Sequence, residues 1–191
     1  MIEIRIHGRG GQGNVVAAYL LASAAFEIGR YCQAFPNFGA ERRGAPVMAF
    51  VRLDVRPILR RSQVRTPAFL IIQDPGLLNV TGVLNGLQER GGVLVNSSRS
   101  SEELSHQTGK TVVSFAATHL ALQITGKPLA NVALLSAFAS LTGLLTREAL
   151  VKALSSRFKE EVLAKNLKLV DMSADRVPSG SWKEIADALS T

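Results

Sequence analysis

The stretch IEIRIHGRGGQGNVVAAYLLASAA, residues 2–25, carries the strongest indication of the fold. Isoleucines alternate with polar residues at its start, which predicts a β-strand with one buried face. Residues 8–13 then satisfy the G-x-G-x-x-G template and lead into a helix rich in Ala and Leu, expected over residues 12–29. A glycine turn between a strand and a helix presents unpaired backbone N–H groups at the positive end of the helix dipole. It therefore predicts an anion-binding loop.

The rest of the chain alternates short apolar runs with longer helical patterns. Further strands are expected at 31–35, 47–53, 68–73, 91–97 and 111–116, and helices at 116–126, 131–142, 146–155, 157–169 and 181–190. Strands that are apolar throughout are typical of a parallel sheet covered on both faces. The pattern predicts an α/β fold: a single Rossmann-like three-layer domain over residues 1–191, with a mainly parallel sheet and a helical C-terminal part.

The glycine template also occurs in dinucleotide-binding proteins, where an acidic residue about twenty positions on closes the second strand and holds the ribose. The expected second strand, 31–35, contains Gln33 and no Asp or Glu, and Glu27 lies back on the helix. A stand-alone NAD(P)- or flavin-binding Rossmann oxidoreductase is therefore the alternative and not the leading hypothesis. A tight strand-to-helix turn without a ligand is the other interpretation of the loop.

Cysteine content limits the chemistry of the chain. Cys32 is the one cysteine among 191 residues, so the chain cannot form an internal disulfide, a Cys₄ zinc site or an iron–sulfur cluster of its own. The three histidines are scattered, and no metal site is predicted. The N-terminal sequence lacks a signal-peptide pattern, and the apolar segment 131–145 is too short to span a bilayer. We expect a cytoplasmic protein that does not enter a membrane.

Positive charge is concentrated in the first third of the chain. The net charge is +7, and residues 1–65 contain ten arginines and no lysine against four acidic residues. Arginine without lysine favours bidentate recognition of phosphate or carboxylate. A nucleic-acid partner is not expected, because the sequence has no interleaved aromatic residues, no helix-turn-helix pattern and no zinc module.

A second motif, QAFPNFGAERRGAPVMAFVR at residues 33–52, is too apolar and too constrained by Pro and Gly for a flexible linker. Aromatic residues and arginine dominate binding energies at interfaces, so this loop favours contact with a partner or a ligand. In the alternative interpretation, its acid and arginines only tie the loop to the body of the protein. The candidate contact residues are Phe35, Phe38, Glu41, Arg42 and Arg43.

Together, the two motifs in residues 8–52 closely resemble the gamma subunit of 2-oxoacid:ferredoxin oxidoreductases, the family that includes pyruvate synthase. The resemblance continues more weakly through GGVLVNSS at 91–98, Asn131 and Asn166, so it covers nearly the whole chain. The sequence departs from the family pattern at Asn14, where an apolar residue is usual, and at Ser136, where glycine is common.

The resemblance implies an accessory subunit of a complex that converts a 2-oxoacid, by default pyruvate, to an acyl-CoA. The complex is expected to use thiamine diphosphate, Mg, [4Fe-4S] clusters and coenzyme A. Thiamine-binding alpha and beta subunits and a ferredoxin-like delta subunit, or fused equivalents, would hold the cofactors. This chain is expected to hold no catalytic residue, to bind no cofactor alone and to be inactive in isolation. We expect its anion loop to bind either a phosphate of coenzyme A or a carboxylate of a neighbouring subunit. The loop residues are Gly8, Arg9, Gly10, Gly11, Gln12, Gly13 and Asn14.

Overall fold

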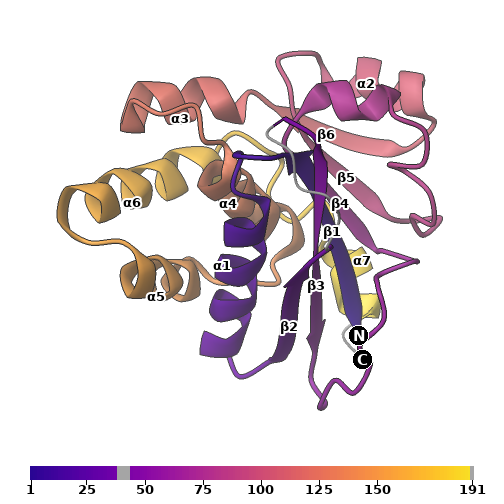
Figure 1. Cartoon of the computed structure of the whole chain (residues 1–191), viewed down its shortest axis with the longest axis horizontal. Coiled ribbons are helices and arrows are strands. Elements are labelled where there is room, and N and C mark those ends of the chain that lie inside the picture. The colour runs from indigo at the N-terminus through magenta and orange to yellow at the C-terminus, as the bar shows by residue number, and fades with distance from the viewer. Residues whose placement is uncertain (38–43, 190–191) are drawn as a thin grey trace.

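The computed structural model describes residues 1–37 and 44–189, which form a sheet with helices on both sides (Figure 1). The strands are β1 (Ile2–Arg9), β2 (Tyr31–Pro36), β3 (Pro46–Asp54), β4 (Phe69–Ile72), β5 (Gly92–Asn96) and β6 (Thr111–Phe115). The helices are α1 (Asn14–Glu27), α2 (Ser101–Thr108), α3 (Ala117–Thr125), α4 (Asn131–Thr142), α5 (Arg147–Arg157), α6 (Glu160–Ala174) and α7 (Lys183–Ala188), with a 3-10 turn η1 (Pro75–Asn79). None of these helices is long and apolar enough to cross a membrane.

The strand order is β2-β3-β1-β4-β5-β6. Strands β1, β4, β5 and β6 are parallel, whereas β3 runs antiparallel to both β1 and β2. The expected α/β class and mainly parallel sheet are confirmed. The position of β3 was not predicted. The connection between β2 and β3 is too short for a helical crossover, so β3 can return only antiparallel, and it inserts beside β1.

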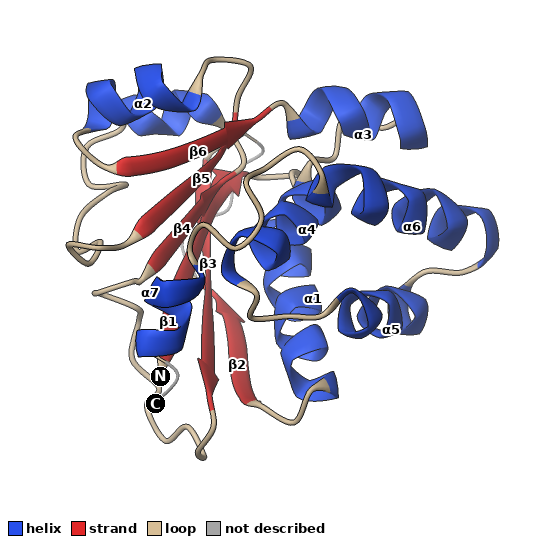
Figure 2. Ribbon diagram, turned by 180° about the vertical axis from the view of Figure 1, so that it is seen from behind, coloured by secondary structure: helices blue, strands red, loops and turns tan. Residues whose placement is uncertain are grey.

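One face of the sheet packs against most of the helices (Figure 2). In that core, α4 is buried along almost its whole length, and its Phe138 meets Phe69 of β4 edge-on at 5.3 Å between ring centroids. Trp182, just before α7, stacks on the same Phe69 ring at 5.6 Å. The C-terminal helices are therefore part of the main core, and burial of each such side chain contributes about 1.5–3 kcal/mol.

The opposite face is covered in two ways. Over β4, β5 and β6, Leu104 of α2 and Leu77 of η1 close a smaller apolar core. Over β1 and β3, polar side chains are buried beneath loops and not beneath helices. These side chains are Glu3, Arg5, His7 and Arg52.

The two edges of the sheet differ. At the β6 edge, the outward amides of Val112 and Ser114 donate to the hydroxyls of Ser105 and Ser101 on α2, at 3.0 and 2.9 Å. At the β2 edge, the Asn37 amide donates to Met48 C=O, which shows which residues of the antiparallel β2–β3 pair are hydrogen-bonded to each other. That register turns the amides of residues 32 and 34 away from the sheet. Helix α2 therefore covers the β6 edge. In the described part of the chain, no side-chain hydrogen bond covers the amides at the β2 edge in the same way.

Candidate functional site

The glycine loop joins the carboxyl end of β1 to the N-terminus of α1, as the sequence predicts. Gly11 has φ +95° and Gly13 has φ +78°, both in the left-handed region that favours glycine. A Cβ at Gly13 would lie 2.7 Å from Nδ2 of Asn131, and a Cβ at Gly8 would collide with the Asn14 side chain. At Gly11, by contrast, no described atom lies within 4 Å of the Cβ position. Gly8 and Gly13 thus serve close packing, and Gly11 lies at the open side of the loop.

Hydrogen bonds within the loop occupy several of its donors. The Gly10 amide donates to Ala45 C=O at 3.0 Å, and the Gln12 amide donates to Arg9 C=O at 3.1 Å. The Gln12 side chain accepts from the Arg9 amide at 2.7 Å. Among the described residues, the amides of Gly11 and Gly13 have no hydrogen-bond acceptor. The loop is therefore rigid, and it offers two backbone donors beside the α1 N-terminus.

Arg9 is held by a partner that the sequence analysis did not identify. Its Nε lies 2.5 Å from Oδ2 of Asp74, and its Nη1 donates to Gly44 C=O at 3.2 Å. The other oxygen of Asp74 accepts from the Gly76 amide at 2.8 Å and caps η1. The charge of Arg9 is thus balanced within the chain, and the backbone of the loop is its main feature for binding an anion.

A chain of side-chain amides joins the carboxyl ends of the parallel strands beneath the loop. Gln73 after β4 donates to Oδ1 of Asn14 at 2.5 Å, and Asn14 donates to Val47 C=O at 3.2 Å. Asn96 at the end of β5 donates to Gln73 C=O at 2.8 Å. Open α/β sheets bind ligands at this edge. Sequence reasoning missed Gln73 and Asn96, although each polar residue directly follows an apolar strand run, which was the available signal.

Asn14 and Ser136, at which the sequence was expected to depart from the family pattern, both make buried hydrogen bonds. Asn14 belongs to the amide chain just described. Ser136 of α4 donates through its hydroxyl to Val170 C=O of α6 at 2.6 Å. Both side chains are almost fully buried.

The sheet topology opposes the dinucleotide alternative. A dinucleotide site needs the strand after the first helix to lie beside β1 and to end in an acidic residue. Here β3 separates β2 from β1. The described end of β2 carries Pro36 and Asn37, neither of which is acidic. The position that a ribose would occupy is thus displaced by one strand.

A pocket of about 320 Å³ lies beside the carboxyl end of β1. It is lined by residues that include His7, Asn37, Pro46, Met48, Leu77 and Val83. Burial, with a smaller contribution from the Arg5 charge, lowers the pKa of His7 to about 3, so the imidazole is neutral at physiological pH. Its Nε2 is buried without a hydrogen-bond partner among the described residues. A general base works best with a pKa near the operating pH, so His7 is unsuited to proton transfer.

The second sequence motif is only partly described. Phe35 is half-buried on β2, where its ring centroid lies 5.2 Å from that of Phe50 and the Arg52 guanidinium sits 5.4 Å from its centre. These contacts tie Phe35 to the sheet. The other predicted contact residues lie outside the described part of the chain: Phe38, Glu41, Arg42 and Arg43. Their role in partner contact stays a prediction.

The donor set of this chain does not fit an iron–sulfur cluster. The described residues contain no group of three or more His, Cys, Asp and Glu side chains that could hold a metal ion. Cys32 is the one cysteine in the sequence, and burial raises the pKa of its thiol. Cluster ligation needs several thiolates together. One cysteine and the described residues therefore do not supply the ligand set of such a cluster.

Comparison with known proteins identifies the family. Residues 3–175 match the family described as pyruvate ferredoxin/flavodoxin oxidoreductase. The pyruvate synthase subunit PorC of Methanocaldococcus jannaschii is 45% identical over 173 residues, which cover 91% of this chain and 95% of that protein. The common subunit gamma of the pyruvate/ketoisovalerate oxidoreductases of Thermococcus kodakarensis is 47% identical over 174 residues, covering 90% and 94%.

Solved structures agree with this assignment. The crystal structure of the pyruvate oxidoreductase subunit PORC of Thermotoga maritima has a TM-score of 0.82 and 35% identity, covering 94% of this chain and 98% of that one. The fold and the glycine loop define an α/β protein with a Rossmann-like, mainly parallel sheet. The chain belongs to the pyruvate ferredoxin/flavodoxin oxidoreductase family, in which it corresponds to the gamma subunit.

Proposed function

We propose that this chain is the gamma subunit of a complex that oxidatively decarboxylates a 2-oxoacid, by default pyruvate, to an acyl-CoA and passes the electrons to ferredoxin. The observation that carries the proposal is its near full-length correspondence, at 45% identity, to a pyruvate synthase subunit. The buried, neutral His7 and the single cysteine support an accessory role, because neither supplies acid–base or redox chemistry.

In this proposal the cofactors of the reaction belong to partner subunits or fused equivalents. Thiamine diphosphate with Mg would be held by alpha and beta subunits, and [4Fe-4S] clusters by a ferredoxin-like delta subunit or fused equivalents. Thiamine diphosphate would supply the carbanion chemistry and the clusters the electron transfer. The residues described here contribute binding surfaces and no step of that chemistry. A cytoplasmic location, expected from the N-terminal sequence, stays a prediction.

The glycine loop is the proposed anion site of this subunit. The amides of Gly11 and Gly13 are free of acceptors among the described residues, and both lie at the positive end of α1. The open space at Gly11 leaves room for a tetrahedral or planar anion. Coenzyme A supplies phosphates and a neighbouring subunit supplies carboxylates, and the backbone donors suit either group.

Activity of the assembled complex tests the function. The chain is co-purified with its partners, and viologen reduction is measured with pyruvate, a branched-chain 2-oxoacid and 2-oxoglutarate, each with coenzyme A. We expect turnover by the complex, highest with pyruvate, and none by the isolated chain. Reduction by the isolated chain, or tight NAD(H) or NADP(H) binding to it, would support the stand-alone oxidoreductase instead.

A glycine pair tests the anion loop. Gly11→Ala places a methyl group in the open space of the loop, and Gly29→Ala is the matched control, with a similar left-handed φ of +78° and equally open surroundings. Loss of a hydrogen bond to a charged group corresponds to about 10–100-fold weaker binding. An increase of that size in the KM for coenzyme A, seen for Gly11→Ala alone, indicates the phosphate. Weaker subunit assembly, seen for Gly11→Ala alone, indicates a carboxylate of a neighbouring subunit. Equal behaviour of the two variants would show that the loop is a structural turn without an anion.

A further inference from the structure

The segment between β3 and β4, residues 55–66, forms an arginine-rich loop that we call the arginine loop. Its sequence, VRPILRRSQVRT, contains four arginines and no acidic residue. Leu59, near its middle, is 88% exposed, and Val55 at its start is 52% exposed. The loop thus carries exposed aliphatic side chains on the same segment as its arginines.

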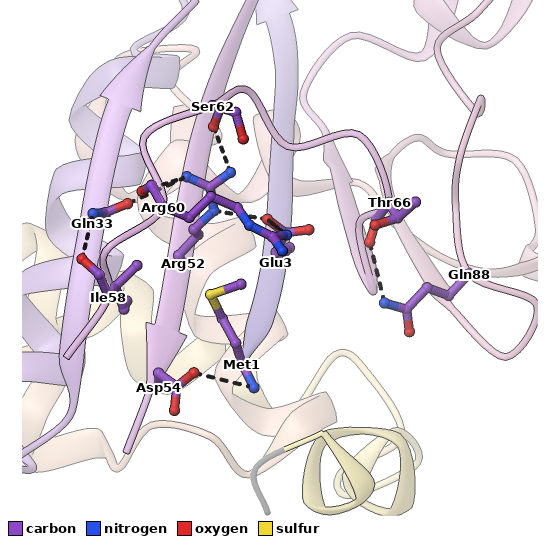
Figure 3. Close-up of polar contacts among 10 residues, drawn as sticks. All are labelled: Met1, Glu3, Gln33, Arg52, Asp54, Ile58, Arg60, Ser62, Thr66 and Gln88. Carbon is purple, nitrogen blue, oxygen red and sulfur yellow. Dashed lines mark hydrogen bonds and ion pairs between the residues drawn. The ribbon is translucent and has the colours of Figure 1, made fainter. Parts of the chain in front are cut away.

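The loop is fixed from below by a buried guanidinium (Figure 3). Arg52 of β3 is fully buried, and its Nη1 and Nη2 donate to the carbonyls of Arg60 and Ser62 at 3.3 and 2.5 Å. Its Nε donates to Glu3 of β1 at 2.8 Å, and Gln33 of β2 donates to Ile58 C=O at 3.1 Å. Three carbonyls of the loop therefore point inward onto the sheet, so the loop has a defined shape.

Two of the four arginines of the loop, Arg61 and Arg65, lack an acidic partner among the described residues. Nη1 of Arg60 lies 3.7 Å from Oε1 of Glu3, and Nε of Arg52 already binds the same oxygen at 2.8 Å. Arg61 and Arg65 form no ion pair with any described residue. The nearest acid along the chain, Asp54, pairs with the N-terminal ammonium group at 3.4 Å. Arg61 and Arg65 therefore give the loop positive charge that no acid of residues 1–37 and 44–189 pairs with.

The loop adjoins the region in which the sequence places partner contacts. Gln63 donates through its side chain to Oδ1 of Asn37 at 2.7 Å, directly before the partner motif that continues at Phe38. The arginine loop and the end of β2 thus form one continuous surface. Because the loop is already ordered, binding through it costs less conformational entropy than binding through a flexible segment.

We propose that the arginine loop docks onto an acidic face of a neighbouring protein subunit, with Leu59 buried in that face and Arg61 and Arg65 paired with its carboxylates. The proposal rests on the proposed function, since it needs a multi-subunit complex. Arginine is enriched at protein interfaces, and the exposed Leu59 adds apolar surface that such an interface can bury. The exposed Leu59 favours a permanent subunit over a diffusing electron carrier, because permanent interfaces are the more hydrophobic ones. The lack of aromatic residues in the loop disfavours single-stranded nucleic acid.

Charge reversal within the co-expressed complex tests the proposal. Arg61→Glu/Arg65→Glu is compared with Lys159→Glu/Lys168→Glu, which changes the net charge equally at exposed positions before and on α6. We expect the arginine variant to associate with its partner subunits at least tenfold more weakly than the lysine variant. We also expect added salt to weaken the wild-type association more than that of the arginine variant.

A second variant probes the apolar part of the surface. Leu59→Ser changes a side chain that is 88% exposed, so the fold of the chain should be unaffected while association weakens severalfold.

Three results would overturn the proposal. The first is that both loop variants assemble like the lysine control. The second is a higher KM for ferredoxin without any change in assembly, and the third is that the variants lose only binding to a single-stranded RNA oligonucleotide. The wild type separates the two hypotheses. If the wild-type complex turns over a 2-oxoacid and the loop variants match the control, only the docking proposal fails. A wild-type chain that neither assembles nor supports turnover removes both.

Discussion

The two faces of β1 are both buried but are stabilised in opposite ways. Ile2, Ile4 and Ile6 point into the helical layer and are 0% exposed. Glu3, Arg5 and His7 point the other way and are at most 7% exposed, yet loops and not helices cover them. Alternation along a strand therefore indicates which residues share a face, and it does not indicate that the polar face meets water.

The polar face works as a set of attachment points for loops. Arg5 donates through Nη2 to the carbonyls of Val83 and Asn85, at 2.9 and 2.7 Å, while Arg52 holds the arginine loop. Apolar packing tolerates many residue combinations of similar volume, whereas each of these hydrogen bonds requires a particular carbonyl. The helical face supplies stability, and the polar face determines the shape of the surface loops.

The largest effect is expected from Arg52→Met. Removing the guanidinium leaves the Glu3 carboxylate buried without its closest partner, and breaking a buried ion pair typically costs about 3–5 kcal/mol. Urea unfolding of the purified chain measures the change in free energy of unfolding. The double variant Glu3→Gln/Arg52→Met should recover much of the loss, because no buried charge remains. Equal destabilisation of the single and double variants would show that the charge pair is unimportant.

The second-largest effect is expected from acidification, which should lower the free energy of unfolding through His7. Its pKa is about 3 in the folded chain and about 6.5 when unfolded, so the unfolded state binds the extra proton between these values. Stability is therefore lost as pH falls below 6.5, by about 2 kcal/mol at pH 5. His7→Gln should reduce the difference in unfolding free energy between pH 7.5 and pH 5 by that amount. An unchanged difference would mean that His7 is protonated in the folded chain.

The smallest effect is expected at Gln33, whose side chain is half-buried and holds Ile58 C=O. Gln33→Ala removes this bond and the one that its Oε1 accepts from Arg52 Nη1 at 3.3 Å. Because Nη1 keeps the Arg60 carbonyl as an acceptor, the cost should stay at about 1 kcal/mol. The substitution should also speed amide hydrogen exchange in the arginine loop. Ile4→Val on the opposite face is the control, since it costs a similar 0.5–1.5 kcal/mol or so by loss of packing. If the control accelerates exchange in the loop equally, the two faces are not independent.

Regular elements were predictable where the pattern is local. The expected helix at 131–142 coincides with α4, and all six strands lie where apolar runs or alternation indicated. Helix α2 was missed because it is polar and short, although Ser100 caps the Glu103 amide at 3.1 Å in a recognisable S-x-x-E pattern. The placement of β3 beside β1 depends on long-range pairing, which residue patterns do not encode.

The candidate site shows the same division between local and long-range information. The position of the glycine loop between β1 and α1 was predicted, whereas the left-handed φ values of Gly11 and Gly13 were not. The ion-pair partner of Arg9 is Asp74, 65 positions away, so the residues around Arg9 in the sequence do not indicate this pairing. The arginine count also overstated the free positive charge, because Arg5 and Arg52 are buried hydrogen-bond donors of the sheet.

The serine hydroxyls of α2 also affect whether the β6 edge can pair with a strand of another molecule. An incoming extended peptide that seeks to lengthen the sheet at β6 finds the Val112 and Ser114 amides already engaged. Unpaired strand edges are templates for fibrillar self-association, and occupied donors remove the template. Replacing both Ser101 and Ser105 by alanine should therefore make the protein more prone to amyloid-like precipitation from that edge.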